Sequence, residues 1–213
     1  NVEAPVAGPT DSGAGEALFA DHDGDGDADL YVPVSVGGTE RWHVRLANAG
    51  AASVYAAAPI NTGVARYGSG RTLEYDGDGR RDLLASGPGT PSTWLVHRST
   101  GTGGFLTAVN TGLSTDAVRA PLPVDVDGDG LDDLVYVRDA LVRIRRNTGS
   151  GFGAEQTTTV GITVNGGSAL IPLLDGAAGA PDFDGDGRRD LLILRGTFSL
   201  IGPPWYYEGF LST

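Results

Sequence analysis

The chain carries the decapeptide DVDGDGLDDL from Asp125 to Leu134, and four copies of this pattern set the period of the whole sequence. The other three are DHDGDGDADL from Asp21, EYDGDGRRDL from Glu74 and DFDGDGRRDL from Asp182. Their starts are 53, 51 and 57 residues apart, close to the length of one four-stranded propeller blade. The spacing predicts an all-β fold, a β-propeller of four-stranded blades with about four blades visible in this chain.

The segments between the acidic loops repeat as well. An apolar run follows each loop, as in residues 134–137, and about ten residues later a second segment alternates apolar and polar residues, as in residues 41–46. Alternation with period two is typical of a half-buried strand. Asn147-Thr148-Gly149 and its counterparts then provide a tight-turn signal. Each repeat should therefore run strand, acidic loop, strand, loop, strand, hairpin, strand, which places the acidic loop between the first and second strands.

The repeats divide the chain into units of one domain. We expect a single β-propeller domain over residues 1–213, with repeats at about 15–63, 64–113, 114–165 and 166–213. The fourth repeat is incomplete, with room for a third strand around residues 205–207 and little more. Residues 1–14 could supply a strand that completes the last blade and closes the ring, or the chain could be part of a longer propeller. Methionine is absent, even at position 1, so we expect a mature, trimmed or excised chain.

The acidic loops have the ligand pattern of a calcium site. Carboxylates occupy positions 1, 3, 5 and 9 of each nine-residue loop, and glycine occupies positions 4 and 6. Calcium takes six to eight oxygen ligands at about 2.3–2.6 Å, and the carbonyl at position 7 of a curled loop can add to the side-chain oxygens. Ligands that are all oxygen argue against zinc and copper. We therefore expect about four Ca²⁺ ions, one per loop.

The predicted ligands occupy equivalent positions in every loop. They are Asp21, Asp23, Asp25, Asp27 and Asp29; Glu74, Asp76, Asp78, Arg80 and Asp82; Asp125, Asp127, Asp129, Leu131 and Asp133; and Asp182, Asp184, Asp186, Arg188 and Asp190. The residues at position 7 act through their carbonyl oxygens. Glu74 is one methylene longer than aspartate, so we expect altered geometry or weaker affinity in the second loop.

The net charge of −12 is a local property of the loops. Eighteen of the 27 acidic residues and four of the 15 arginines lie in them, which leaves nine acids and eleven bases elsewhere. The acidity therefore points to metal rather than to a basic partner. No basic run with interleaved aromatics supports nucleic-acid binding, and no apolar stretch is long enough for a membrane span.

The decapeptides resemble the FG-GAP and VCBS repeats, the calcium-loop propeller blades also found in integrin α-subunits. The motif D-x-D-G-D-G-x-x-D-L and its Glu74 variant cover nearly the whole chain, and Phe152-Gly153 is similar to the family's phenylalanine-glycine element. The resemblance implies structural calcium that faces away from the usual ligand surface. It also implies a secreted or cell-surface protein, and residues 145–153 are similar to versions in bacterial adhesins and RHS-type toxins.

The residues predict no enzyme. His22 is a non-ligand position of the first loop, His43 and His97 are expected on polar strand faces, and no serine lies in a G-x-S-x-G elbow. Carboxylates that bind metal are unsuited to acid catalysis because the ion holds their pKa values down.

Aromatic residues are the best candidates for binding. Trp42 and Trp94 share strand faces with valines and are expected in the core, whereas Trp205, Tyr206 and Tyr207 form the preferred surface candidate. The expected partner is a protein or a carbohydrate. Three functions stay open: a binding or adhesion module, a non-catalytic scaffold segment of a larger secreted toxin or enzyme, and a calcium-dependent lectin.

Overall fold

The structure, a computed structural model, describes residues 17–47, 55–56, 58–118, 121–161, 191–196 and 205–210. Every regular element in these residues is a β-strand, so the fold is all-β, as predicted. The expectations for residues 1–14 and for the fourth acidic loop, residues 182–190, lie outside the described residues.

Twelve of the fourteen described strands form three four-stranded antiparallel sheets. The first contains β1 (Leu18–Ala20), β2 (Asp29–Val36), β3 (Thr39–Arg45) and β4 (Ile60–Ala65). The second contains β5 (Gly70–Leu73), β6 (Asp82–Ser86), β7 (Thr93–His97) and β8 (Val109–Ser114). The third contains β9 (Leu122–Val124), β10 (Asp133–Arg138), β11 (Leu141–Arg145) and β12 (Gln156–Gly161).

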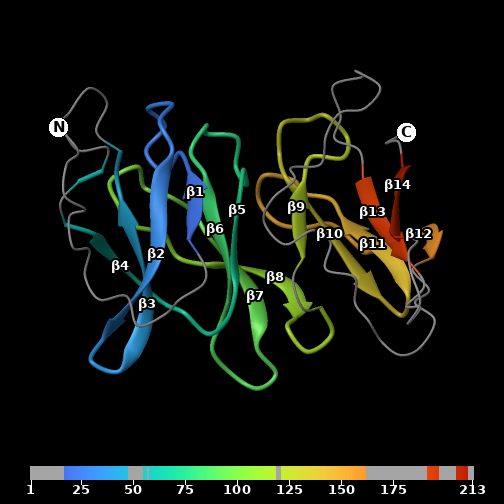
Figure 1. Cartoon of the computed structure of the whole chain (residues 1–213), viewed down its shortest axis with the longest axis horizontal. Coiled ribbons are helices and arrows are strands. Elements are labelled where there is room, and N and C mark those ends of the chain that lie inside the picture. Colours follow the sequence, from blue (N-terminus) through green and yellow to red (C-terminus); the bar gives the residue numbers. More distant parts are fainter. Residues whose placement is uncertain are drawn as a thin grey trace.

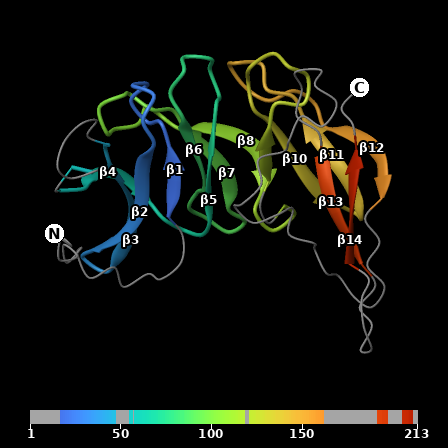
Figure 2. The same ribbon diagram turned by 45° about the horizontal axis from the view of Figure 1, so that its top comes forward.

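Strand order within each sheet follows the sequence, and the sheets lie side by side as propeller blades (Figures 1 and 2). The first strands of neighbouring blades meet, because β1 contacts β5 and β5 contacts β9. Each acidic loop joins the first strand of its blade to the second, as the sequence predicts, and the three loops lie together along the top of Figure 1.

The fourth repeat contributes a two-stranded sheet among the described residues. In it, β13 (Leu191–Gly196) pairs antiparallel with β14 (Trp205–Phe210). These strands follow the fourth acidic loop in sequence, and β14 confirms the strand expected around Trp205. The described part of the chain holds no helix of the length and hydrophobicity that crossing a bilayer requires.

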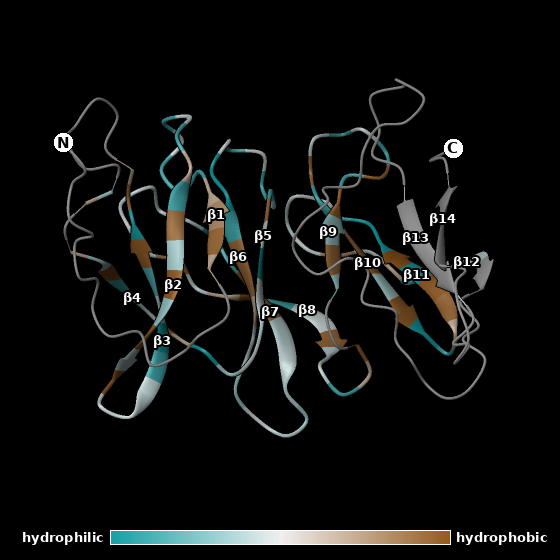
Figure 3. Cartoon of the chain, viewed as in Figure 1, coloured by the Kyte–Doolittle hydropathy of each residue, from teal (hydrophilic) through white to brown (hydrophobic). Residues whose placement is uncertain are grey.

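The hydrophobic core lies between blades rather than within one sheet. One cluster joins the first two blades and is built around Tyr31, Trp42 and Leu83. Another joins the second and third blades around Trp94 and Tyr136. The strands carry most of the hydrophobic residues, while the acidic loops are hydrophilic (Figure 3). Burial of these aromatic side chains removes a large apolar area from water and holds the blades face to face.

The position of a blade in the row explains its burial pattern. All five residues of β6 are buried, since the second blade packs against a neighbour on both faces. In β2 buried and half-buried residues alternate from Asp29 to Val34, because one face of the first blade packs on the second blade. Trp42 and Trp94 are 0% and 1% exposed, which confirms that they are core residues and rules them out as a sugar-stacking surface.

The predicted hairpins are present in the second and third blades. Isolated bridges pair Ser99 with Phe105 and Asn147 with Phe152. Gly101 and Gly149 adopt φ values of 74° and 72° inside these turns, a left-handed conformation that favours glycine. The turns bring Phe105 and Phe152 back onto the preceding blade.

Candidate metal centres

The first acidic loop curls around its own position-1 carboxylate. One oxygen of Asp21 accepts the backbone N–H of Gly24 at 2.7 Å, and the other accepts that of Gly26 at 2.9 Å. Both glycines have positive φ values, 82° and 91°, which side chains other than glycine rarely adopt. The alternating D-G-D-G sequence therefore forms a tight loop with the carboxylates on its inside.

The other two described loops repeat this geometry. Asp125 accepts N–H bonds from Gly128 and Gly130 at 2.7 and 3.0 Å, and Glu74 accepts one from Gly77 at 2.9 Å. The position-5 carboxylate of each loop accepts the N–H of position 7: Asp25 from Asp27, Asp78 from Arg80 and Asp129 from Leu131.

Three carboxylates converge in each described loop. The sets are Asp21, Asp23 and Asp29; Glu74, Asp76 and Asp78; and Asp125, Asp127 and Asp129. In each set one oxygen per residue lies within 4.8 Å of the others. Calcium–oxygen bonds of about 2.3–2.6 Å place ligands on opposite sides of an ion about 5 Å apart, so this spread fits a Ca²⁺ ion. The donor set is oxygen alone, which suits calcium and not a thiophilic metal.

The structure brings nine of the fifteen ligands predicted in the three described loops into these sets. Asp29 joins the first set, whereas Asp82 and Asp133, its counterparts at position 9, are outside the second and third. Asp25 lies in the first loop but outside its set. These residues and the position-7 carbonyls of Asp27, Arg80 and Leu131 stay predicted ligands.

The position-9 aspartates are buried structural residues, a role that the sequence motif did not reveal. Asp82 is 1% exposed, and its two oxygens accept the N–H groups of Tyr75 at 3.1 Å and Ser99 at 2.7 Å. Equivalent bonds link Asp29 to the N–H groups of His22 and Ala47. Each position-9 carboxylate thus ties the start of its acidic loop to the end of the third strand.

Burial governs the protonation of these acids. It raises the pKa of Asp82 to about 7, and it also raises the pKa values of Asp29 and Asp133. Hydrogen bonds from backbone N–H groups oppose this shift at all three residues. A divalent cation in the loop would favour the charged forms.

Guanidinium groups lie beside the second and third loops. Arg98 is 3.6 Å from Asp76, and Arg80 pairs with Asp78. Arg146 is 3.3 Å from Asp127 and 2.7 Å from Asp133. These arginines partly neutralise the carboxylates in the ion-free protein.

Neighbouring loops are joined by hydrogen bonds. The N–H of Arg81 donates to the carbonyl of Asp21 at 2.7 Å, and the N–H of Asp132 donates to the carbonyl of Glu74 at 2.8 Å. The Asp132 carboxylate also accepts the Glu74 N–H at 2.8 Å and the Arg81 guanidinium at 2.6 Å. The residue at position 8 of one loop, Arg81 or Asp132, therefore forms a backbone hydrogen bond with the residue at position 1 of the preceding loop.

His22 forms a further link between the first two blades. It is fully buried, and its Nε2 accepts the N–H of Gly103 at 3.1 Å, which leaves the ring proton on Nδ1 to donate to the Tyr31 hydroxyl at 2.8 Å. Tyr31 in turn donates to the carbonyl of Arg81 at 3.1 Å. Burial lowers the pKa of His22 to about 4, so the neutral ring is the stable form.

Two sequence expectations fall outside these observations, and one needs correcting. The fourth loop and the side chains of Trp205, Tyr206 and Tyr207 lie outside what the structure describes. His43, expected on a polar strand face, is 6% exposed, and burial lowers its pKa. The alternation of β3 hid this because Thr39–Arg45 buries both faces of the strand at His43 and Val44.

Fold and loops together define a β-propeller repeat protein that carries one acidic, oxygen-only loop in each described blade. The sequence profile of the FG-GAP-like repeat family matches residues 75–136 and 125–193, which together span more than half of the chain. The chain belongs to this family. No curated protein matches it.

Two solved structures match part of this chain. One is an Agrocybe aegerita lectin described as recognising non-reducing terminal N-acetylglucosamine, with 24% identity over 67% of this chain and 38% of the lectin, and a TM-score of 0.49. The other is the Tc holotoxin pore of Photorhabdus luminescens, with 20% identity over 70% of this chain and 7% of that chain, and a TM-score of 0.42. This chain spans less than half the length of either.

Proposed function

We propose that this protein is an extracellular, calcium-stabilised β-propeller module that binds a protein or glycan partner and catalyses no reaction. One observation carries the proposal. Three loops at the same end of adjacent blades each converge carboxylate oxygens to within 4.8 Å. Repulsion among these acids disfavours the curled loops without a cation, so an ion in each loop would stabilise the blades that the loops join.

The open position of the loops supports an extracellular role. Gly24, Asp25 and Gly26 are exposed, as are Asp127, Gly128 and Asp129. Extracellular calcium modules work with dissociation constants of about 10⁻⁴–10⁻³ M, which exposed loops of a few carboxylates can provide. Cytosolic calcium would leave such sites empty.

The surroundings of His22 support the absence of catalysis. Its ring nitrogens lie 3.2 Å from the Ser99 hydroxyl, the one contact in the described residues that resembles a serine–histidine pair. Ser99 is 2% exposed and its hydroxyl donates to the His22 carbonyl at 2.6 Å. A substrate cannot reach this serine, and its proton is already committed to a structural bond.

Calcium dependence of stability tests the proposal. We expect the melting temperature to fall when EGTA replaces calcium, because a site at a hundredfold excess over its dissociation constant contributes about 2.7 kcal/mol. Magnesium at the same concentration should restore little, since it demands a tighter octahedral site. Asp21→Asn together with Asp125→Asn should reduce the calcium effect. Equal melting temperatures in calcium and EGTA would refute it.

Calorimetry counts the calcium sites, and partner binding separates the binding module from the scaffold alternative. Calcium titration should show one ion for each of the three described loops and a fourth for residues 182–190. A protein that binds calcium but neither a glycan on an array nor a protein on a cell surface would instead be a scaffold segment of a larger protein.

A further inference from the structure

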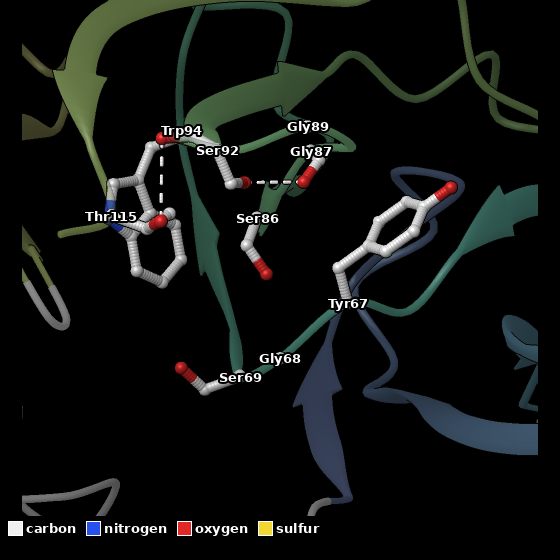
Figure 4. A pocket seen from close by; sticks show the side chains of 9 residues that line it. All are labelled: Tyr67, Gly68, Ser69, Ser86, Gly87, Gly89, Ser92, Trp94 and Thr115. Carbon is white, nitrogen blue, oxygen red and sulfur yellow. Dashed lines mark hydrogen bonds between the residues drawn. The ribbon is translucent and has the colours of Figure 1, made fainter.

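A pocket of about 300 Å³ lies at the end of the blades opposite the metal loops. It is formed by the segment between β4 and β5, the β6–β7 connection and the residue after β8. Because β5 and β6 run from this end to the second metal loop, the pocket and the loop are separated by the length of the strands. The side chains that line it are Tyr67, Ser69, Ser86, Ser92, Trp94 and Thr115 (Figure 4).

Ser86 is the group that points to a ligand. Its side chain extends into the pocket between Tyr67 and Ser69 (Figure 4). The residue is only 8% exposed, yet its hydroxyl has no hydrogen-bond partner. Buried polar groups are nearly always paired, so an unpaired hydroxyl aimed into a cavity marks a place where a polar ligand completes the bonding.

Ser92 and Thr115 hold the pocket in shape. Ser92 donates to the carbonyl of Gly87, and Thr115 donates to the carbonyl of Ser92 at 3.3 Å. Gly68 keeps the space above Ser86 open, because a Cβ at this position would lie 2.9 Å from the Ser86 hydroxyl oxygen. The site is therefore preformed and does not need the metal loops for its geometry.

The chemistry of the lining selects the ligand. None of the residues that line the pocket carries a charge, so a charged group would be desolvated without compensation. Tyr67 is 59% exposed and offers one aromatic surface at the rim, next to the hydroxyl groups. A wholly apolar ligand would leave Ser86 unpaired, whereas a pyranose ring has both an apolar face and hydroxyl groups. The volume is at the lower end of the roughly 300–1,000 Å³ typical of small-molecule sites, which suits one ring.

We propose that this pocket binds a single uncharged sugar ring, which stacks on Tyr67 and exchanges a hydrogen bond with Ser86. The inference rests on the proposed binding function and names the ligand class and the site. The sugar could be a free monosaccharide or the terminal residue of a glycan.

Binding is tested on the full chain in calcium with neutral hexoses and N-acetylhexosamines, followed by saturation-transfer NMR and calorimetry. At least one should bind with a Kd of about 1 mM or tighter, while glucuronic acid and glucosamine should not bind. A glycan array distinguishes the sources: binding there together with weak binding of the free sugar assigns the site to glycan termini. Absence of binding to every neutral sugar in both formats would overturn the proposal.

Three substitutions locate the site. Tyr67→Ala should weaken binding about tenfold, and Gly68→Ala should abolish it by filling the space against Ser86. Ser86→Ala should weaken binding about three- to tenfold without lowering the melting temperature, because the hydroxyl it removes has no partner in the protein. If Ser86 had only a structural role, Ser86→Ala would lower the melting temperature. Phe19→Ala and Ser150→Ala, which remove an exposed aromatic ring and an exposed hydroxyl elsewhere, are the matched controls.

The same samples separate this inference from the proposed function. Equal melting temperatures of the unmodified protein in calcium and in EGTA would contradict calcium stabilisation. A melting temperature that depends on calcium, together with no sugar binding, would contradict only the sugar site. Sugar binding that is unchanged in Tyr67→Ala and Gly68→Ala would place it elsewhere and refute the assignment of this pocket.

Discussion

At the scale of single residues, the position-9 aspartates are predicted calcium ligands, and the structure shows that they are also buried hydrogen-bond acceptors. Asp82 belongs to the predicted calcium ligands, but it is 1% exposed and already accepts two backbone N–H groups. An ion ligand matters only when the ion is bound, whereas a buried hydrogen-bond acceptor matters in every state of the folded protein.

Replacing Asp82 tests this distinction. Asp82→Ala leaves the N–H groups of Tyr75 and Ser99 without their acceptor, and each unsatisfied buried group costs about 1–3 kcal/mol. We expect the free energy of unfolding to fall by about 2–5 kcal/mol in calcium and in EGTA alike, measured by urea denaturation. Asp78→Ala, in the exposed part of the same loop, is the control and should lose only the calcium-dependent part. A cost of Asp82→Ala that disappears in EGTA would show a purely ion-binding role.

His97 makes stability depend on pH. Burial lowers its pKa to about 4, and its ring packs edge-on against Phe105 at 5.9 Å between centroids. Above pH 6.5 the histidine is neutral in both states, so its contribution is complete there. As the pH falls from 6.5 towards 4, the unfolded chain takes up a proton that the folded protein does not, and stability decreases.

We expect this histidine to cost about 1–2 kcal/mol of stability by pH 5, at about 1.4 kcal/mol per pKa unit. Thermal unfolding of the unmodified protein and of His97→Gln at pH 7.5 and pH 5 measures the difference. The variant should lose less stability on acidification, and equal losses would show that His97 protonates freely in the folded state.

At the scale of elements, loops of nearly the same sequence have different surroundings. Arg98 and Arg146 occupy equivalent places after the third strand of their blades, and each lies beside the position-3 aspartate of its loop. The first blade has Leu46 at this place. The first loop therefore lacks a cation supplied from this position.

Exchanging this residue should change calcium binding. Arg146→Leu copies the first blade and removes a positive charge that competes with the ion at Asp127 and Asp133. The Arg146–Asp127 pair is partly exposed and such pairs are worth about 0–1 kcal/mol, so we expect the third loop to bind calcium up to about fivefold more tightly. The ion-free protein should be less stable, because the buried Asp133 carboxylate loses its charged partner. Calorimetric titration and melting in EGTA measure the two effects, with Arg41→Leu, remote from the loops, as control. Weaker calcium binding in Arg146→Leu would contradict this account.

The sequence predicted the elements better than the contacts between them. Strand alternation and the D-G-D-G loops located the blades, because both patterns are local in the chain. The hydrogen bonds of His22 to Ser99 and Gly103 span 77 and 81 residues, so no local pattern contains them. The sugar pocket was missed for the same reason, since Tyr67, Ser86 and Thr115 share no motif. Trp42 and Trp94 were assigned to the core correctly, because neighbouring valines marked their strand face.

At the scale of the whole molecule, hydrogen bonds connect each described acidic loop to the next. Asp132 holds the backbone of Glu74 and the side chain of Arg81, so ordering of the third loop also orders the second. Two sites that order the same backbone bind ions with positive cooperativity.

Removing the hydrogen bonds between the second and third loops should make their calcium sites bind independently. Asp132→Ala removes the carboxylate that joins the second and third loops but is not itself a predicted ligand. We expect a lower Hill coefficient in a calcium titration with little change in the number of ions bound. Asp139→Asn, which removes an exposed carboxylate at the opposite end of the third blade, should behave like the unmodified protein. An unchanged Hill coefficient in Asp132→Ala would mean that the loops bind independently.

The opposite placement of the acidic loops and the sugar pocket has a consequence for how such proteins diversify. Each described acidic loop must keep its aspartates and glycines, because they shape the backbone and include the predicted calcium ligands. The connections at the other end, residues 66–69 and 87–92, contain none of the predicted ion ligands, and outside Gly68, Gly87 and Gly89 they carry no such requirement. Heritable variation can therefore accumulate at one end of the blades, altering what is recognised, while the other end stays fixed from one descendant to the next.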